Sequence, residues 1–113
     1  MNDTLSFEDF TKVDLRVGTI IEVNDFPEAR HPAYQLNIDF GDLGIKKSSA
    51  QITALYSKED LLYRQIVAIV NFPKKQIAKF MSECLVLGAV DGKDVILLNP
   101  EVKVKNGMVV SWW

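Results

Sequence analysis

Residues 13–21 read VDLRVGTII, and this stretch gives the strongest indication of the fold. Its first five residues alternate between apolar and polar, which is the pattern of a half-buried β-strand. Gly18 then interrupts the alternation, and two adjacent isoleucines, Ile20 and Ile21, follow. A long strand with a bulge or a sharp bend near Gly18 explains both observations.

The sequence after this first strand predicts further strands and one short helix. The clearest strand is YQLNIDFG at 34–41, in which Tyr34, Leu36, Ile38 and Phe40 fall on one face. The other expected elements are strands at 45–53, 65–71, 84–90 and 94–98, a helix at 57–63 capped by Ser57 and Asp60, and a basic connection at 72–83.

This order of elements predicts an all-β fold. A bent first strand, a helix between the third and fourth strands and a small closed sheet are the parts of a five-stranded Greek-key barrel, the OB-fold. We therefore expect such a barrel with short helices and terminal extensions. The OB-fold binds oligonucleotides and other ligands on one face, so the fold alone does not identify the ligand.

Length and composition fit a single domain spanning residues 1–113, because 113 residues of which 48% are hydrophobic can form one compact core. The single cysteine, Cys84, lies in the apolar run CLVLGAV and is expected to be a buried thiol. No apolar run approaches membrane-spanning length, and the acidic N-terminus lacks the features of a signal peptide. We expect a cytoplasmic protein without membrane insertion.

The net charge of −2 hides a basic middle. Residues 1–29 carry two basic and seven acidic side chains, a balance of −5, and residues 80–113 carry three and four, a balance of −1. Residues 30–79 carry eight basic and four acidic side chains, a balance of +4. This segregation fits either an anion-attracting face or a mixed, solvated surface.

The sequence offers little for catalysis, and we predict that the protein is not an enzyme. One histidine and one cysteine cannot form a metal site of the usual kind, and no glycine-rich phosphate motif is present, so no metal or cofactor is expected. His31 lies between loop residues with no serine placed beside it. In KKSSAQIT at 46–53, same-face Lys and Ser residues lie about 6.5–7 Å apart along a strand, too far for a Ser–Lys pair.

Several segments together resemble a known family. DLRVGTI, EARHPAYQLNIDFG, KKSSAQIT, NFPKKQIAKFMSECLVLGA and VKNGM occur in the order typical of stand-alone tRNA-binding-domain proteins, and they are most similar to the CsaA branch. The resemblance implies an OB-fold homodimer that acts as a cytoplasmic, export-related chaperone for unfolded or precursor polypeptides, with the export machinery as a further partner. The wider family implies the alternative, a tRNA- or RNA-binding protein that uses the basic face of the same fold.

The candidate ligand contacts combine charged, hydrogen-bonding and apolar side chains. They are Arg30, Lys46, Lys47, Ser48, Ser49, Gln51, Asn71, Phe72, Lys74, Lys75, Lys79 and Ser82. Of these, Asn71, Lys74, Lys75 and Ser82 match the tRNA-binding pattern of the resembled family, whereas Glu83 adds an acid beside the expected phosphate path. For residues 49–52, packing at a barrel corner is an alternative to ligand contact.

The two ends of the chain carry apolar side chains that have no evident place inside a barrel. We expect a homodimer interface formed by Leu5, Phe7, Phe10, Met108, Val110, Trp112 and Trp113. A frayed C-terminal tail is the alternative for the two tryptophans.

Overall fold

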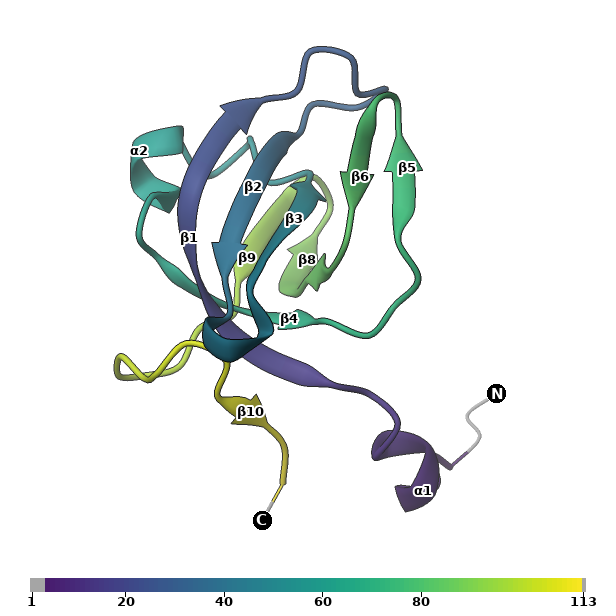
Figure 1. Cartoon of the computed structure of the whole chain (residues 1–113). Helices are drawn as coiled ribbons and strands as arrows, with labels where there is room; N and C mark the ends of the chain where they lie inside the picture. Colours follow the sequence, from purple (N-terminus) through teal and green to yellow (C-terminus); the bar gives the residue numbers. More distant parts are fainter. Residues whose placement is uncertain (1–3, 113) are drawn as a thin grey trace.

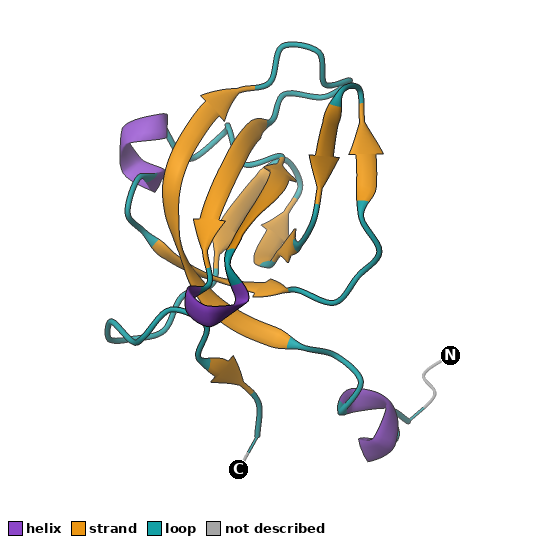
Figure 2. Ribbon diagram, in the orientation of Figure 1, coloured by secondary structure: helices purple, strands orange, loops and turns teal. Residues whose placement is uncertain are grey.

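The structure, a computed structural model, describes residues 4–112 and has strands throughout with only short helices (Figures 1 and 2). The elements in chain order are α1 Phe7–Phe10, β1 Leu15–Asp25, β2 Tyr34–Asp39, the 3-10 helix η1 Gly41–Leu43, β3 Ile45–Ala50, α2 Lys58–Leu61, β4 Gln65–Ile69, β5 Lys75–Ile77, β6 Phe80–Ser82, β7 Leu85–Val86, β8 Gly88–Asp91, β9 Asp94–Leu97 and β10 Val109–Val110. Trp113, predicted at the dimer interface, lies outside the described residues.

Strand β1 is long and bent, as predicted. The irregularity in its pairing with β2 falls between Ile20 and Glu22, so the bulge lies slightly beyond Gly18. Gly18 has a different reason to be glycine, since a Cβ atom there would lie 2.6 Å from Cγ2 of Ile38 and 2.7 Å from Cε1 of Phe40. The missing side chain lets β1 pass directly over the core side chains of the neighbouring strand.

The alternation in β2 builds the centre of the core. Leu36, Ile38 and Phe40 are fully buried, and Tyr34 is partly buried against the same cluster. Full burial of one such side chain stabilises the fold by about 1.5–3 kcal/mol. The prediction for this strand is confirmed.

The barrel closes through a short segment that follows β6. The main sheet has the order β3-β2-β1-β4-β7, and the segment just before β7 returns to the free edge of β3. There the main-chain N–H of Glu83 donates to the carbonyl of Lys47 at 2.7 Å, and the N–H of Ser49 donates to Oγ of Ser82 at 3.3 Å. We call this line of contacts between 82–84 and β3 the seam. With it the strands form the nearly closed five-stranded barrel that the sequence predicts.

Two hairpins extend from the barrel, and one of them was not predicted. Strands β8 and β9 pair across a two-residue turn, as expected for strands joined by the sequence DGK at 91–93. The expectation that residues 72–83 form only a connection is wrong, because β5 and β6 pair as a second hairpin with Ala78 at positive φ in its turn. Helix α2 begins at the predicted capping box, in which Ser57 and Asp60 bond each other's main-chain N–H.

Helix α1 and strand β10 both lie at the lower end of the molecule, outside the barrel (Figure 1). Strand β10 pairs with the first residues of β1, and α1 carries no buried residue. Among residues 4–112, no helix is long and apolar enough to cross a membrane.

Candidate ligand-binding face

Strand β3 separates the predicted contacts onto two faces. Ser48 is only 1% exposed, and its hydroxyl donates to the carbonyl of Ser49. Its prediction as a ligand contact is therefore wrong, because side chains alternate along a strand and this one points into the core. Lys46 shares the inward face and is half-buried, whereas Lys47 is exposed on the outer face with Ser49. The two lysines do not form one charged patch.

The seam places an acid among the predicted basic contacts. One carboxylate oxygen of Glu83 accepts a hydrogen bond from the main-chain N–H of Lys47 at 2.9 Å, and the other lies 3.5 Å from Nζ of Lys74. Ser82 is occupied as well, since its hydroxyl accepts from Ser49 and donates to the carbonyl of Cys84. Glu83 thus neutralises part of the positive charge that a phosphate would meet.

An apolar groove of about 250 Å³ lies beside the seam. Phe72, Pro73, Lys75, Ser82, Cys84 and Leu85 line it. Phe72 is 53% exposed and Leu85 49% exposed, so the groove offers apolar surface directly to solvent. Phe72, Lys75 and Ser82 were predicted from the sequence. Leu85 was not among the predicted contacts, because nothing in the apolar run CLVLGAV distinguishes an exposed side chain from a buried one.

Of the remaining predicted cations, Lys75 lines this groove, and Lys79 and Arg30 lie on neighbouring segments outside its lining. Lys75 and Lys79 are exposed on the β5–β6 hairpin, and Arg30 is exposed on the loop between β1 and β2. The hairpin and that loop meet through Phe26 and Phe80, whose ring centroids lie 5.4 Å apart. Figure 1 shows both at one end of the molecule. Gln51 is exposed elsewhere, in a separate groove against the β8–β9 hairpin.

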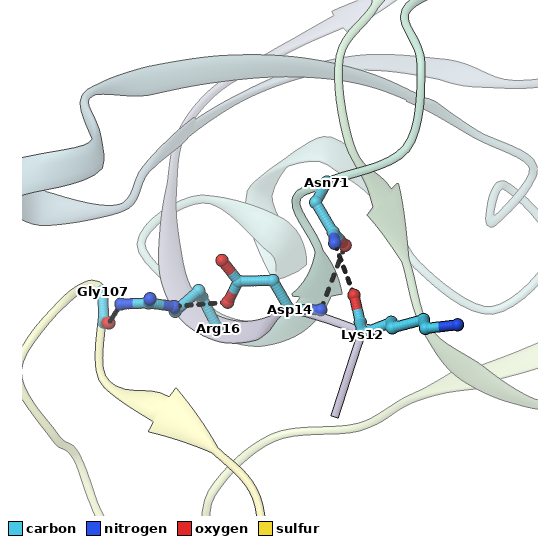
Figure 3. Close-up of polar contacts among 5 residues, drawn as sticks. All are labelled: Lys12, Asp14, Arg16, Asn71 and Gly107. Atoms are coloured by element: carbon cyan, nitrogen blue, oxygen red, sulfur yellow. Dashed lines mark hydrogen bonds and ion pairs between the residues drawn. The ribbon is translucent and has the colours of Figure 1, made fainter. Parts of the chain in front are cut away.

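Asn71 has a structural role that its predicted role as a ligand contact did not anticipate. Its side-chain oxygen accepts from the N–H of Asp14 at 3.0 Å, and its side-chain nitrogen donates to the carbonyl of Lys12 at 2.7 Å (Figure 3). Arg16 makes a second link nearby, to Asp14 at 2.6 Å and to the carbonyl of Gly107 at 3.0 Å. The contacts of Asn71 hold residues 12–14 just before β1, and those of Arg16 attach Gly107 to β1.

Cys84 lies at the base of the groove and is chemically quiet. Burial raises the pKa of its thiol to about 12, with smaller effects from Lys46 and Glu83. Since the thiolate is the reactive form, a thiol with this pKa stays protonated at neutral pH. The prediction of a buried thiol is confirmed.

Four of the predicted dimer residues are gathered on one apolar surface. Leu5, Phe7, Phe10 and Trp112 line a shallow hollow of about 580 Å³. The rings of Phe7 and Trp112 meet edge to face with centroids 4.9 Å apart, although both residues remain more than half exposed. Met108 is exposed nearby on the chain, and Val110 is partly buried in β10.

The sequence of the barrel matches a known family. Residues 15–109 match the family described as "Putative tRNA binding domain". The chain belongs to this family. Curated relatives include the methionine–tRNA ligases of Thermococcus onnurineus and Thermococcus kodakarensis, each 41% identical over 103 residues, which is 91% of this chain. This tRNA-binding domain spans only about one seventh of their length, since the match covers 14% of each ligase.

Solved structures give matches over whole chains. The chaperone CsaA of Bacillus anthracis is 54% identical with a TM-score of 0.92, and CsaA of Picrophilus torridus is 52% identical with a TM-score of 0.90. Each match covers 96% of this chain and all of the other. The chain is therefore of the CsaA type within the tRNA-binding-domain family, as the resemblance in sequence indicated.

Proposed function

We propose that the chain acts as a chaperone that binds unfolded or precursor polypeptide segments in the groove beside the seam. The observation that carries this proposal is the exposed apolar lining formed by Phe72, Pro73 and Leu85, next to the polar groups of Lys75 and Ser82. Unfolded chains present apolar side chains next to polar main chain, and such a groove suits both. The similarity to two structures titled as CsaA chaperones supports the proposal.

The charges around the groove favour polypeptide over nucleic acid. A phosphate backbone is bound by several lysines and arginines without competing acids. Here Glu83 pairs with Lys74, Lys46 faces inward, and Arg30 is not among the residues that line the groove. Binding by apolar contact and hydrogen bonds is the mode that this arrangement supports best.

tRNA binding is the second candidate, and a specific observation favours it. Lys75 and Lys79 remain exposed on the β5–β6 hairpin without an acid paired to either among residues 4–112. The family description and the methionine–tRNA ligases that share it add weight. On this candidate the basic hairpin contacts phosphates, and catalysis remains outside this chain's role.

We further propose that the chain works as a homodimer in the cytoplasm, with the export machinery as a downstream partner. The hollow lined by Leu5, Phe7, Phe10 and Trp112 is an apolar surface at the chain ends, and a two-fold axis there covers both copies at once. Two grooves in one particle lengthen the surface available to an extended polypeptide.

Salt dependence separates the two candidate ligands. We expect binding of a reduced, unfolded protein to change little between about 50 mM and 200 mM salt, whereas tRNA binding weakens steeply over that range. Phe72→Ser should weaken binding of the unfolded protein, and Val102→Ser, an exposed apolar residue outside the groove, serves as the matched control. Tight tRNA binding with no measurable binding of unfolded protein contradicts the chaperone proposal.

Light scattering tests the dimer. The double variant Phe7→Ser/Trp112→Ser removes the edge-to-face pair at the chain ends, and we expect it to be monomeric at micromolar concentration. Its barrel should melt as the wild type does, because neither residue is part of the buried core. A monomeric wild type at that concentration contradicts the homodimer.

A further inference from the structure

A second groove has a volume of about 580 Å³. It lies between the β8–β9 hairpin and two other segments, residues 31–32 in the loop before β2 and residues 51–54 after β3. Its aliphatic floor consists of Val90 and Val95 from the hairpin, Ala54 from the segment after β3, and Pro32 from the loop before β2. Val90 is 72% exposed, so the floor lies open to solvent. Neither the family match nor the groove beside the seam accounts for it.

Four polar side chains stand around this floor. They are His31, Gln51, Thr53 and Lys93. Among residues 4–112, none of the four side chains forms a hydrogen bond or an ion pair with another residue. Each therefore remains available to a ligand, and together they offer an amide, a hydroxyl, an imidazole and an ammonium group.

The charge inside the groove favours a carboxylate. Among residues 4–112, no acidic residue lines the groove, whereas Lys93 does. Asp91 and Asp94 flank that lysine in sequence, but they form the strand pair next to the one made by Val90 and Val95. Since neighbouring pairs of a hairpin point to opposite faces, both aspartates point away from the floor.

The main chain of the hairpin is also suited to a polypeptide. Gly92 has φ of +62° and Lys93 has no positive φ, the pattern of a two-residue type II′ turn. The pair after such a turn, Val90 with Val95, is not hydrogen-bonded across the hairpin. The N–H and C=O groups of these two valines thus point outward to the edges, where an extended chain can pair with them.

We propose that this groove is a second polypeptide contact site, specific for an extended segment with an aliphatic side chain next to a carboxylate. Its floor is aliphatic and without Phe, Tyr or Trp, so it lacks the flat surfaces on which nucleic-acid bases stack. This inference rests on the proposed polypeptide binding and deepens it by naming a second site and the chemistry of its ligand.

The test uses the full chain and end-blocked peptides with a central valine followed by aspartate, asparagine or lysine. Binding is followed by fluorescence anisotropy and by the amide NMR signals of Gly92 and Val95. We expect the aspartate peptide to bind most tightly and to shift both signals. A further peptide with a free C-terminal carboxylate in place of aspartate shows which source of the carboxylate the site takes.

Two exposed positions provide the variants, so the fold should be retained. Lys93→Glu should weaken the aspartate peptide about two- to fivefold and leave the asparagine peptide unchanged. Val90→Gln should weaken both peptides, by about tenfold for loss of one apolar contact. Lys103→Glu, an exposed lysine outside this groove, is the matched control.

The outcomes distinguish this site from the proposed function. If the peptides bind but shift only the signals of Phe72 and Leu85, the second site is overturned and the chaperone proposal stands. If tRNA and no peptide shifts the signals of Gly92 and Val95, the groove is a nucleic-acid site and the inference is wrong. If no polypeptide binds at all, both the site and the proposed function are overturned.

Discussion

The barrel and the two chain ends are held by different kinds of contact. In the barrel, fully buried apolar side chains such as Leu36 and Ile66 carry the packing. At the ends, polar side chains make the attachments, with Asn71 holding Lys12 and Gln65 holding Val104. The ends are therefore positioned by hydrogen bonds, while their own apolar side chains are left on the surface.

The two regions also differ in how much of their apolar surface is buried. Phe7 and Trp112 are 56% and 58% exposed, although an aromatic residue can bury about 150–250 Å². Their contact with each other covers part of that area only. A core that uses its apolar surface internally needs no partner, whereas these ends have apolar surface available for one.

The largest expected effect is in the barrel. Leu36→Asp places a charge at a fully buried position without a partner, and we expect no folded protein. Leu55→Asp, at an exposed leucine, should change the free energy of unfolding by less than about 0.5 kcal/mol. Circular dichroism on heating measures both variants. A Leu36→Asp protein that melts like the wild type would contradict the claim that buried apolar side chains stabilise the barrel.

An intermediate effect is expected where the C-terminal segment is attached. The side chain of Gln65 donates to the carbonyl of Val104 at 2.7 Å and accepts from its N–H at 3.0 Å. Gln65→Ala should cost about 1–3 kcal/mol by leaving these main-chain groups without a partner. Hydrogen exchange should rise at residues 104–110 and stay low in β2.

Gln76→Ala is the control for this variant, because Gln76 is exposed on the β5–β6 hairpin and its side chain donates to the carbonyl of Ala78, two residues away. Faster exchange throughout β2 in the Gln65 variant contradicts a local attachment and shows that the segment belongs to the cooperative unit of the barrel.

The smallest effect concerns labelling, without any change in stability. Cys84 is buried in the barrel, and a thiol with a pKa of about 12 gives almost no thiolate at about pH 8. We expect iodoacetamide to label Cys84 only after denaturation. A cysteine introduced at the exposed end by Ser111→Cys should react at once in the folded protein. Equal labelling rates at Cys84 and at the introduced cysteine would contradict the burial of Cys84.

Local patterns predicted the parts of the fold that depend on neighbouring residues. The alternation from Tyr34 to Phe40 identified the core strand, and Ser57 with Asp60 identified the start of α2. Both signals arise within a few residues, so no knowledge of distant partners is needed. The β5–β6 hairpin gave a weaker signal, because its strands have three residues each and its turn is formed by Ala78 instead of glycine.

The candidate site was harder to predict because its side chains form hydrogen bonds with residues that are far away along the sequence. Asn71 bonds residues 57 and 59 positions away, and Glu83 bonds a main-chain group 36 positions away. Neither partner can be identified from spacing along the chain. Ser48 was misplaced for another reason, since a small hydroxyl side chain can fill a barrel interior as readily as it can bind a ligand.

Glu83 takes part both in the closure of the barrel and in the charge along the seam. Its main chain and side chain both hold the free edge of β3, and the same carboxylate offsets the charge of Lys74. An exchange of this acid for a residue without a side-chain acceptor, such as alanine or lysine, would leave Lys74 unpaired and, in the same step, remove a hydrogen bond that closes the barrel. Barrel closure and the charge along the seam therefore share one side chain, so a substitution at this position changes both at once.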